Sequence, residues 1–289
     1  MVGYKQNSTT VIDSTNTVTV RNVVVNNVRK RYGTHPLSNG YHAGGATPNL
    51  TPVNRADIQK FPFASDGNAT DTNGDLLDGA TWGAGAESAT HSFVAAADEE
   101  NHPTPALSDR IQKYPFAITS GTSSEVGNLT FGRRESTGHT DGGSGFIAGG
   151  WGGFGYAVPP PSLSIARTTI DKFPFASDGN AVNVGDQDWP RRKAAGSSSS
   201  THGYASGGES NPNIPGDVGV RIERFSFATG VSAAVGSLTE YAGFIMGGNS
   251  SSTHGYRSGG VRAPSSFYSP QNIIDKFPFP PATANATDV

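Results

Sequence analysis

The sequence contains no cysteine and has few charged side chains. Without cysteine, the chain can form neither disulfide bonds nor thiolate metal sites, and it has no thiol nucleophile. Charged residues make up 16% of the 289 residues, against about a quarter in an average globular protein. The net charge of −3 and the pI near 6.1 provide no overall field that would gather nucleic acid or an anionic membrane. Solubility must therefore come from uncharged polar groups.

Long hydrophobic runs and helical periodicity are also missing. No stretch approaches the ~18 apolar residues of a membrane helix, and the N-terminal MVGYKQNSTTVIDSTNT has no signal-peptide pattern. We therefore expect no membrane insertion and no export by a signal peptide. No segment of useful length repeats its apolar residues every 3.6 positions. Glycine (38) and proline (19) make up about a fifth of the chain and fall at recurring positions, which favours a turn-rich β protein.

A short aromatic motif around Phe-Pro-Phe recurs five times. The first aromatic residues of the five copies lie 53, 59, 52 and 52 positions apart: Phe61, Tyr114, Phe173, Phe225 and Phe277. A second aromatic landmark precedes each motif by 20 to 27 residues, often just before a Gly-Gly pair: Tyr41, Phe93, Phe146, Tyr204 and Tyr256. Shared landmarks at a fixed period indicate internal repeats.

Each repeat contains several short β segments separated by Gly, Ser, Asn, Asp and Pro. A period of about 52 residues with about four strands per unit is typical of a β-propeller. We predict an all-β fold with a five-bladed propeller over residues 17–289, in units of approximately 17–66, 67–119, 120–178, 179–230 and 231–289. Residues 1–16 are polar and are expected to form an arm. The ring is expected to be closed by the N- and C-terminal segments, with the valine-rich residues 17–25 completing the circle.

Proline has no N–H for a β ladder, so within sheets it is confined to edges. We therefore predict that Phe-Pro-Phe marks the outermost strand of each blade, where proline also protects the edge. Because alternate residues share one face of a strand, the two aromatic side chains can wedge against the next blade while the proline points away.

The order of landmarks resembles the kelch-type repeat of β-propellers over residues 17 to 289. An aromatic strand ending in Gly-Gly is followed by a loop, a second aromatic strand, a turn and a basic residue. Kelch repeats have Tyr-Asp on the outer strand, where this sequence has Lys-Phe or Arg-Phe, and only Trp82 and Trp189 match the kelch tryptophan. The tandem IDKFPFASDGNA and STHGYxSGG units also look like those of virion-associated proteins of tailed bacteriophages. That resemblance implies a structural or host-attachment component of a virus particle, made in the host cytoplasm.

From this resemblance we expect a non-enzymatic virion protein, exposed as a tail appendage or capsid decoration, that attaches to a glycan of the host surface. The alternative is an assembly or bracing protein without a ligand, which contacts other virion proteins through its arm or a propeller face. A third reading is a glycosidase. No nucleophile elbow, Walker loop, HExxH motif or carboxylate pair occurs, and Glu87, Asp98, Glu99 and Glu100 fall in an irregular part of the second unit. No cofactor is expected.

Tyrosine and histidine residues of the repeats are the first candidate ligand-binding residues. Tyr204 and Tyr256 could stack on a sugar, and the alternative is that both pack between blades. His202 and His254, like His91, lie two positions before the aromatic landmark. They could bind a metal ion or an anion, or they could form turn or inter-blade hydrogen bonds.

Basic residues follow the opening segment of three units. Residues 29–31, Arg133 with Arg134, and Arg191 with Arg192 would grip phosphate or acidic sugars if they shared one face of the propeller. The alternative is that they are solvated strand ends that pair with nearby aspartates.

One acidic stretch has the spacing of a calcium loop. Asp71, Asn73 and Asp75 alternate around a glycine turn, but Trp82 stands where an EF-hand has its glutamate. The alternative is an Asx turn between strands, and we predict no metal site.

Overall fold

A computed structural model of the chain describes residues 5–6, 9–10, 39–46, 54–65, 67–99, 107–152, 165–210, 219–243, 246–262, 269–279 and 284–289. The chain divides into two compact units, 1–30 and 31–289. In the first unit, β1 (Lys5–Gln6) pairs antiparallel with β2 (Thr9–Thr10). The predicted arm lies partly outside the described residues, and the valine-rich residues 17–25 lie entirely outside them.

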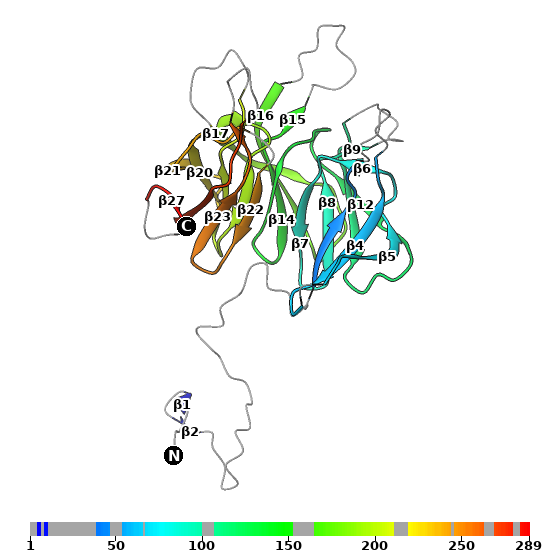
Figure 1. Cartoon of the computed structure of the whole chain (residues 1–289). Coiled ribbons are helices and arrows are strands. Elements are labelled where there is room, and N and C mark those ends of the chain that lie inside the picture. Colours follow the sequence, from blue (N-terminus) through cyan, green and yellow to red (C-terminus); the bar gives the residue numbers. More distant parts are fainter. Residues whose placement is uncertain are drawn as a thin grey trace, which may run out of the picture. The chain divides into compact units, whose positions relative to one another are not determined.

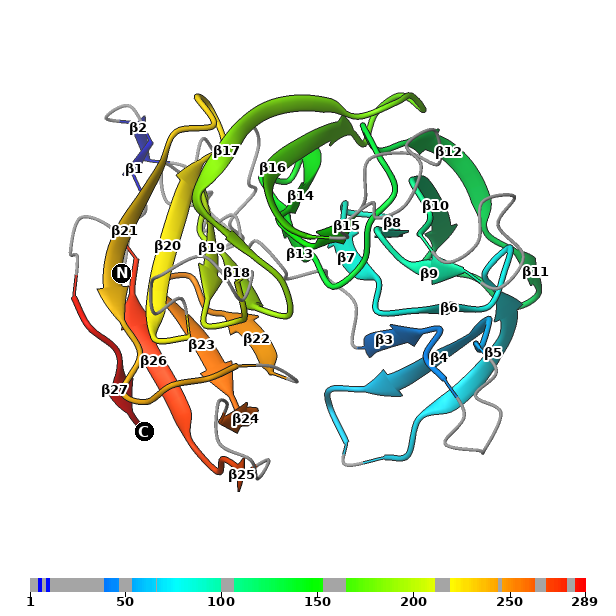
Figure 2. The same cartoon turned by 90° about the horizontal axis from the view of Figure 1, so that it is seen from above.

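The second unit is a five-bladed β-propeller, and its described residues contain strands but no helix. Five small sheets stand in a ring (Figures 1 and 2). Blade 1 contains β3 (Asn39–Ala43), β4 (Asp57–Pro62) and β5 (Thr70–Asp75), with β11 (Gly121–Thr122) paired parallel to β5. Blade 2 contains β7 (Ala84–Glu87), β8 (His91–Ala95), β10 (Arg110–Pro115) and β12 (Ser124–Asn128). The all-β and five-bladed predictions are therefore confirmed.

The remaining blades follow the same plan. Blade 3 contains β13 (Thr137–Thr140), β14 (Ser144–Ala148), β16 (Ile165–Pro174) and β17 (Val182–Arg191), and β15 (Trp151–Gly152) pairs with the start of β16. Blade 4 contains β18 (Ala195–Ser198), β19 (His202–Ser206), β20 (Arg221–Ser226) and β21 (Ser232–Ser237). Blade 5 contains β22 (Gly247–Ser250), β23 (His254–Ser258), β26 (Ile274–Pro278) and β27 (Thr287–Asp288). Two short pairs, β6 (Ala80–Thr81) with β9 (Asp98–Glu99) and β24 (Val261–Arg262) with β25 (Ser269–Pro270), lie outside these sheets.

In blades 2 to 5 the chain runs from an inner strand at the axis outward through a second, a third and an outer strand. The landmark residues place β3 and β4 as the second and third strands of blade 1. The expected unit boundaries fall between third and outer strands, because β5 pairs with β4 although it follows residue 66. The units 67–119, 120–178 and 179–230 therefore each hold the outer strand of one blade and the first three strands of the next, and the last unit also holds β27, the outer strand of blade 5.

The prediction that Phe-Pro-Phe marks the outermost strand is wrong, because each motif ends the third strand. In blade 3, Pro174 pairs with Ser144 of the second strand, whereas pairing with the outer strand stops two residues earlier, at Lys172 and Val182. The Phe175 N–H donates inward to the Gly143 carbonyl, so the neighbouring proline nitrogen faces outward. The proline nitrogen lies past the end of the ladder with the outer strand, where no hydrogen-bond donor is needed. The five-bladed architecture is unaffected by the wrong assignment of the motif to the outer strand.

Blade 4 shows what this outward position does when it is not proline. Ser226 replaces the proline and donates its backbone N–H to the Val231 carbonyl at 3.0 Å, which closes a tight turn into β21. The proline position is therefore a strand end whose outward donor is optional.

Aromatic rings join successive blades. The motif does wedge between blades, but the prediction of the next blade as its partner is wrong, because the rings pack against the preceding blade. Phe175 stacks on Phe93 of blade 2 with ring centroids 4.6 Å apart, and Phe173 meets the same ring at 5.6 Å. The same pattern recurs for Tyr114 and Phe116 on Tyr41, Phe225 and Phe227 on Phe146, and Phe277 and Phe279 on Tyr204. In blade 3, Gly145 pairs opposite Phe173, and a Cβ there would lie 2.3 Å from the ring.

A buried acid two positions before the aromatic ties the third strand to the connection from the preceding blade. Asp171 accepts hydrogen bonds from the Thr130 N–H and hydroxyl and forms an ion pair of 3.0 Å with Arg133. In blade 4, Arg191 pairs with Glu223 at 2.9 Å. These ion pairs are fully desolvated, so removing one partner would leave an uncompensated buried charge.

Candidate functional site

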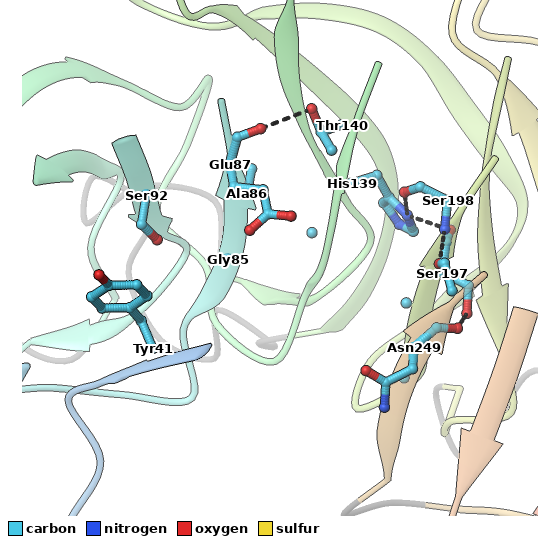
Figure 3. Close-up of a pocket in the computed structure, with 14 residues that line it drawn as sticks. Tyr41, Gly85, Ala86, Glu87, Ser92, His139, Thr140, Ser197, Ser198 and Asn249 are labelled. Carbon is cyan, nitrogen blue, oxygen red and sulfur yellow. Dashed lines mark hydrogen bonds between the residues drawn. The ribbon is translucent and has the colours of Figure 1, made fainter. Parts of the chain in front are cut away.

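The inner strands surround a cavity of about 480 Å³ on the propeller axis (Figure 3). Its lining comes from β7, β13, β18 and β22, together with Tyr41 of β3 and Ser92 of β8. Each of these four inner strands contributes one glycine to the lining: Gly85, Gly138, Gly196 and Gly248. A Cβ on Gly138 would lie 1.9 Å from the Gly85 carbonyl oxygen, so the strands approach one another at a distance that only glycine permits.

Neutral polar groups dominate the cavity wall. Thr140 donates its hydroxyl to the Glu87 carbonyl of blade 2 at 3.1 Å, and Ser197 donates to the Asn249 carbonyl of blade 5 at 3.0 Å. Ser250 accepts the N–H of Ser198 at 2.8 Å. These bonds fix the inner strands of neighbouring blades against one another. A wall of hydroxyl, amide and backbone groups is suited to a neutral polar ligand that offers several donors and acceptors.

Glu87 contributes the one carboxylate among the described lining residues of this cavity. It ends β7, and Figure 3 shows its side chain on the cavity side of that strand. Burial raises the pKa of the Glu87 carboxyl above its ordinary value. A desolvated carboxylate of this kind accepts strong hydrogen bonds from ligand hydroxyl groups.

His139 is the one imidazole among the described residues that line the cavity, and it is buried in the wall. Its Nδ1 lies 3.0 Å from the Ser197 carbonyl, which can only accept, so this nitrogen carries the proton. Its Nε2 lies 2.8 Å from the Thr137 hydroxyl, and its ring meets Phe225 edge-on at 5.0 Å. Burial lowers the pKa of His139 to about 4, so the ring is neutral at pH 7 and joins blades 3 and 4.

A second cavity of about 280 Å³ shares Tyr41, Gly85 and Ser92 with the first. Trp82 lines it with 49% of its surface exposed and a left-handed φ of 58°. Glu135 and Lys193 have the same conformation at the matching positions of blades 3 and 4. The Glu135 N–H donates to the Trp82 carbonyl, and the Lys193 N–H donates to the Glu135 carbonyl. This relay between blades explains the backbone conformation, and it leaves the indole free to contact a ligand.

The two predicted tyrosines have different environments. Tyr204 is 1% exposed, and its ring stacks on Phe279 at 4.7 Å. It therefore packs between blades, which is the alternative that the repeat pattern left open, and it offers no ring face to a ligand. Tyr256 is half-buried on β23 of blade 5, where its ring lies near His254.

The structure does not bring the repeated histidines together. His91, His202 and His254 begin the second strands of three separate blades, and none lines the axial cavity. Each Nδ1 lies 2.8 Å from the hydroxyl of the preceding threonine. Burial lowers the pKa of all three rings. Their geometry is that of turn-stabilising residues.

The four predicted arginines that the structure describes are all engaged in ion pairs. Arg133 and Arg191 are buried with their acidic partners, as described above. Arg134 pairs with Asp98 and Arg192 with Glu135 and Glu209, and the side chains of both arginines are less than a third exposed. Residues 29–31 lie outside the described residues.

The predicted calcium loop is an Asx turn. The Asn73 N–H donates to the Asp71 Oδ1 at 2.8 Å, and Asn73 has a φ of 59°. The stretch, with Asp75, lies on β5. Within the described ranges, no group of three or more potential metal ligands is found.

The candidate site residues that the sequence did not reveal are those of the inner strands, including His139 and Asn249. The sequence signal that could have found them is a recurring glycine. Gly85, Gly138, Gly196 and Gly248 lie 53, 58 and 52 residues apart, which follows the period of the aromatic motif. No known protein family matches the chain, and no curated protein matches it. In the described part of the chain, no helix is long and apolar enough to cross a membrane.

Proposed function

We propose that this protein is a non-enzymatic component of a bacteriophage particle that binds a neutral saccharide of the host surface in its axial cavity. The observation that carries the proposal is the cavity of about 480 Å³, walled by hydroxyl, amide and backbone groups with the Glu87 carboxylate on one side. Saccharides offer many hydroxyl groups and apolar ring faces, which such a wall and the neighbouring Trp82 indole complement. The likeness of the tandem units to those of virion-associated phage proteins supports a place on the tail or capsid, among other virion proteins.

The test is a titration of the purified chain with a panel of bacterial surface saccharides. We expect Glu87→Gln to weaken binding by roughly tenfold or more, because a hydrogen bond to a charged acceptor contributes about 1.5–3 kcal/mol. Asp75→Asn is the matched control, since it removes an exposed carboxylate on β5 outside the cavity. Equal affinity of both variants, or no binding by the wild type, would reject the proposal.

The second candidate is a bracing protein without a ligand. The aromatic wedges and buried ion pairs between blades favour it, because they make a rigid body, and Tyr204 belongs to that packing. Deleting residues 1–16 separates the two candidates. Loss of particle incorporation with saccharide binding intact supports an anchored adhesin, whereas absence of binding in the intact protein supports the brace.

A glycosidase is the third candidate. Most glycosidases use two carboxyl groups about 5–9.5 Å apart, whereas Glu87 is the one carboxylate that the described lining residues supply. Release of reducing sugar from host polysaccharide would reverse this ranking.

A further inference from the structure

A five-bladed ring has five interfaces between neighbouring blades, and four of them share one aromatic geometry. In each, the second aromatic residue of the motif lies 4.5 to 5.1 Å from the second-strand aromatic of the preceding blade. The first aromatic residue lies 5.6 to 6.4 Å from the same ring. The fifth interface, between blades 5 and 1, would use Phe61, Phe63 and Tyr256.

Among the residues that the structure describes, the two halves of this fifth interface do not contact each other. Phe61 is 37% exposed and Phe63 is 66% exposed, whereas their counterparts Phe277 and Phe279 are 1% and 6% exposed. Phe61 and Phe63 contact each other edge-on at 5.7 Å. On blade 5, Tyr256 is half-buried and lies beside His254, and no phenylalanine of the described ranges stacks on it as Phe279 stacks on its counterpart Tyr204.

The position of blade 5 relative to blade 1 follows from the four packed interfaces. Aromatic contacts join each successive pair of blades from 1 to 5. Inner-strand hydrogen bonds also join blade 2 to blade 3 and blade 4 to blade 5. With these joints made, Phe61 and Phe63 stay exposed, although Tyr256 belongs to the same unit. Figure 2 shows β4 of blade 1 and β23 of blade 5 as separate strands of the two blades at the ends of this series. Exposing two aromatic side chains to water is unfavourable, and burying them against a complementary apolar surface would lower the free energy.

We propose that the Phe61–Phe63 pair of one chain seats on Tyr256 of a second copy, so that the protein associates head to tail. The partner surface has the chemistry already seen four times in the fold, with Phe63 stacked on Tyr256 and Phe61 tilted against it. Such a contact joins two different surfaces, so each copy keeps one wedge and one receptor for further copies. It would gather several axial cavities in one assembly and raise the avidity for a repetitive surface.

Sedimentation of the purified full chain over a range of concentrations, without saccharide, tests the contact. We expect dimers and larger species, and a rise of at least tenfold in the apparent dissociation constant for Phe63→Ala or Tyr256→Ala, since buried aromatic residues are common hot spots. Phe131→Ala is the matched control, because Phe131 lies in the connection to blade 3 and not at either free surface. A wild-type chain that stays monomeric at every concentration, as closure of the ring within one chain would produce, overturns the proposal.

Mixing the variants gives a second, directional test. Phe63→Ala keeps the receptor and Tyr256→Ala keeps the wedge, so the mixture is expected to form a one-to-one heterodimer and nothing larger. Neither variant alone is expected to associate. Thermal unfolding of each variant checks that it is folded. Failure of two folded variants to complement each other would overturn the head-to-tail arrangement, whatever the saccharide titration shows.

Discussion

The same ten residues, KFPFASDGNA, occur in blade 1 at 60–69 and in blade 3 at 172–181, and they have different surroundings. The strand register is the same: Phe61 pairs with Gly40 and Phe173 with Gly145. The burial is not, because Phe173 is 1% exposed and Phe61 is 37% exposed. The local sequence therefore determines the strand and its register. The aromatic side chain of the preceding blade determines how far the motif is buried, and so how much the motif stabilises the fold.

Truncating the first phenylalanine of each copy should show the largest contrast. We expect Phe173→Ala to lower the free energy of unfolding by about 3–5 kcal/mol, because it empties a site packed against Phe93. Phe61→Ala should cost less than about 1 kcal/mol in the monomer, as expected for a partly exposed side chain. Urea denaturation at low protein concentration, where copies are separate, measures both. Equal losses would show that blade 1 is packed like blade 3.

Acid titration extends the contrast to histidines in packed and open positions. His139 is buried between blades with its pKa lowered to about 4, whereas the unfolded ring titrates near 6.5. The unfolded chain binds the extra proton, so this contribution is complete above pH 6.5 and is lost as the pH falls toward 4. The loss amounts to about 3 kcal/mol.

The measurement is the unfolding free energy at pH 7 and pH 4.5, compared with that of two variants. His139→Gln should flatten the profile, although it lowers stability at pH 7. His254→Gln, at the less buried start of β23, should leave most of the wild-type acid loss in place, although burial lowers the pKa of this ring too. If His139→Gln shows the same acid loss as the wild type, another group is responsible.

Filling the glycine opposite each phenylalanine should have a smaller, graded effect. A Cβ at Gly145 or Gly40 would lie 2.3 Å from the paired phenylalanine ring. In blade 3 that ring is held by Phe93 and Phe175, so we expect Gly145→Ala to cost about 1–3 kcal/mol. In blade 1 the ring can move into solvent, so Gly40→Ala should cost less than about 1 kcal/mol. Thermal denaturation of the pair decides, and a reversed order would contradict the comparison.

The smallest effects are expected at the proline position, where blades 3 and 4 differ naturally. Pro174→Ser should change stability by less than about 0.5 kcal/mol, because the nitrogen faces outward past the ladder. Ser226→Pro should cost about 1 kcal/mol, because it removes the hydrogen bond to the Val231 carbonyl. Chemical denaturation of both variants checks this, and a severe loss for Pro174→Ser would mean that the proline has a further role.

The fold was predictable because the same aromatic residues recur once in every repeat. Aromatic pairs spaced by about 52 positions predicted five blades and the wedge between them. The position of the Phe-Pro-Phe strand within the blade was not predictable in the same way. A proline shows that its nitrogen needs no hydrogen-bond partner, but not whether the strand is the outermost one or merely ends there. Pro174 needed the pairing of Ser144 to decide this.

The candidate site was less predictable because its chemistry depends on partners distant in sequence. The charge of Arg133 predicts an exposed side chain, yet Arg133 is buried in an ion pair with Asp171, 38 positions away. Tyr204 is suited to sugar stacking until Phe279 of the next blade covers it. The axial lining lies on short glycine-containing strands with no distinctive motif, so His139 was not singled out. The virion role and the saccharide ligand stay predictions.

The mismatch between blade and sequence unit has a consequence for how such a chain can change its length. Arg133 and Asp171 stand in different elements of the fold, yet both belong to the unit 120–178, and Arg191 and Glu223 both belong to 179–230. Duplicating or deleting one whole unit would therefore carry each buried base together with its own acid. With the boundary between the third and the outer strand, a repeat can be gained or lost as a unit, and the charges of these buried ion pairs stay balanced.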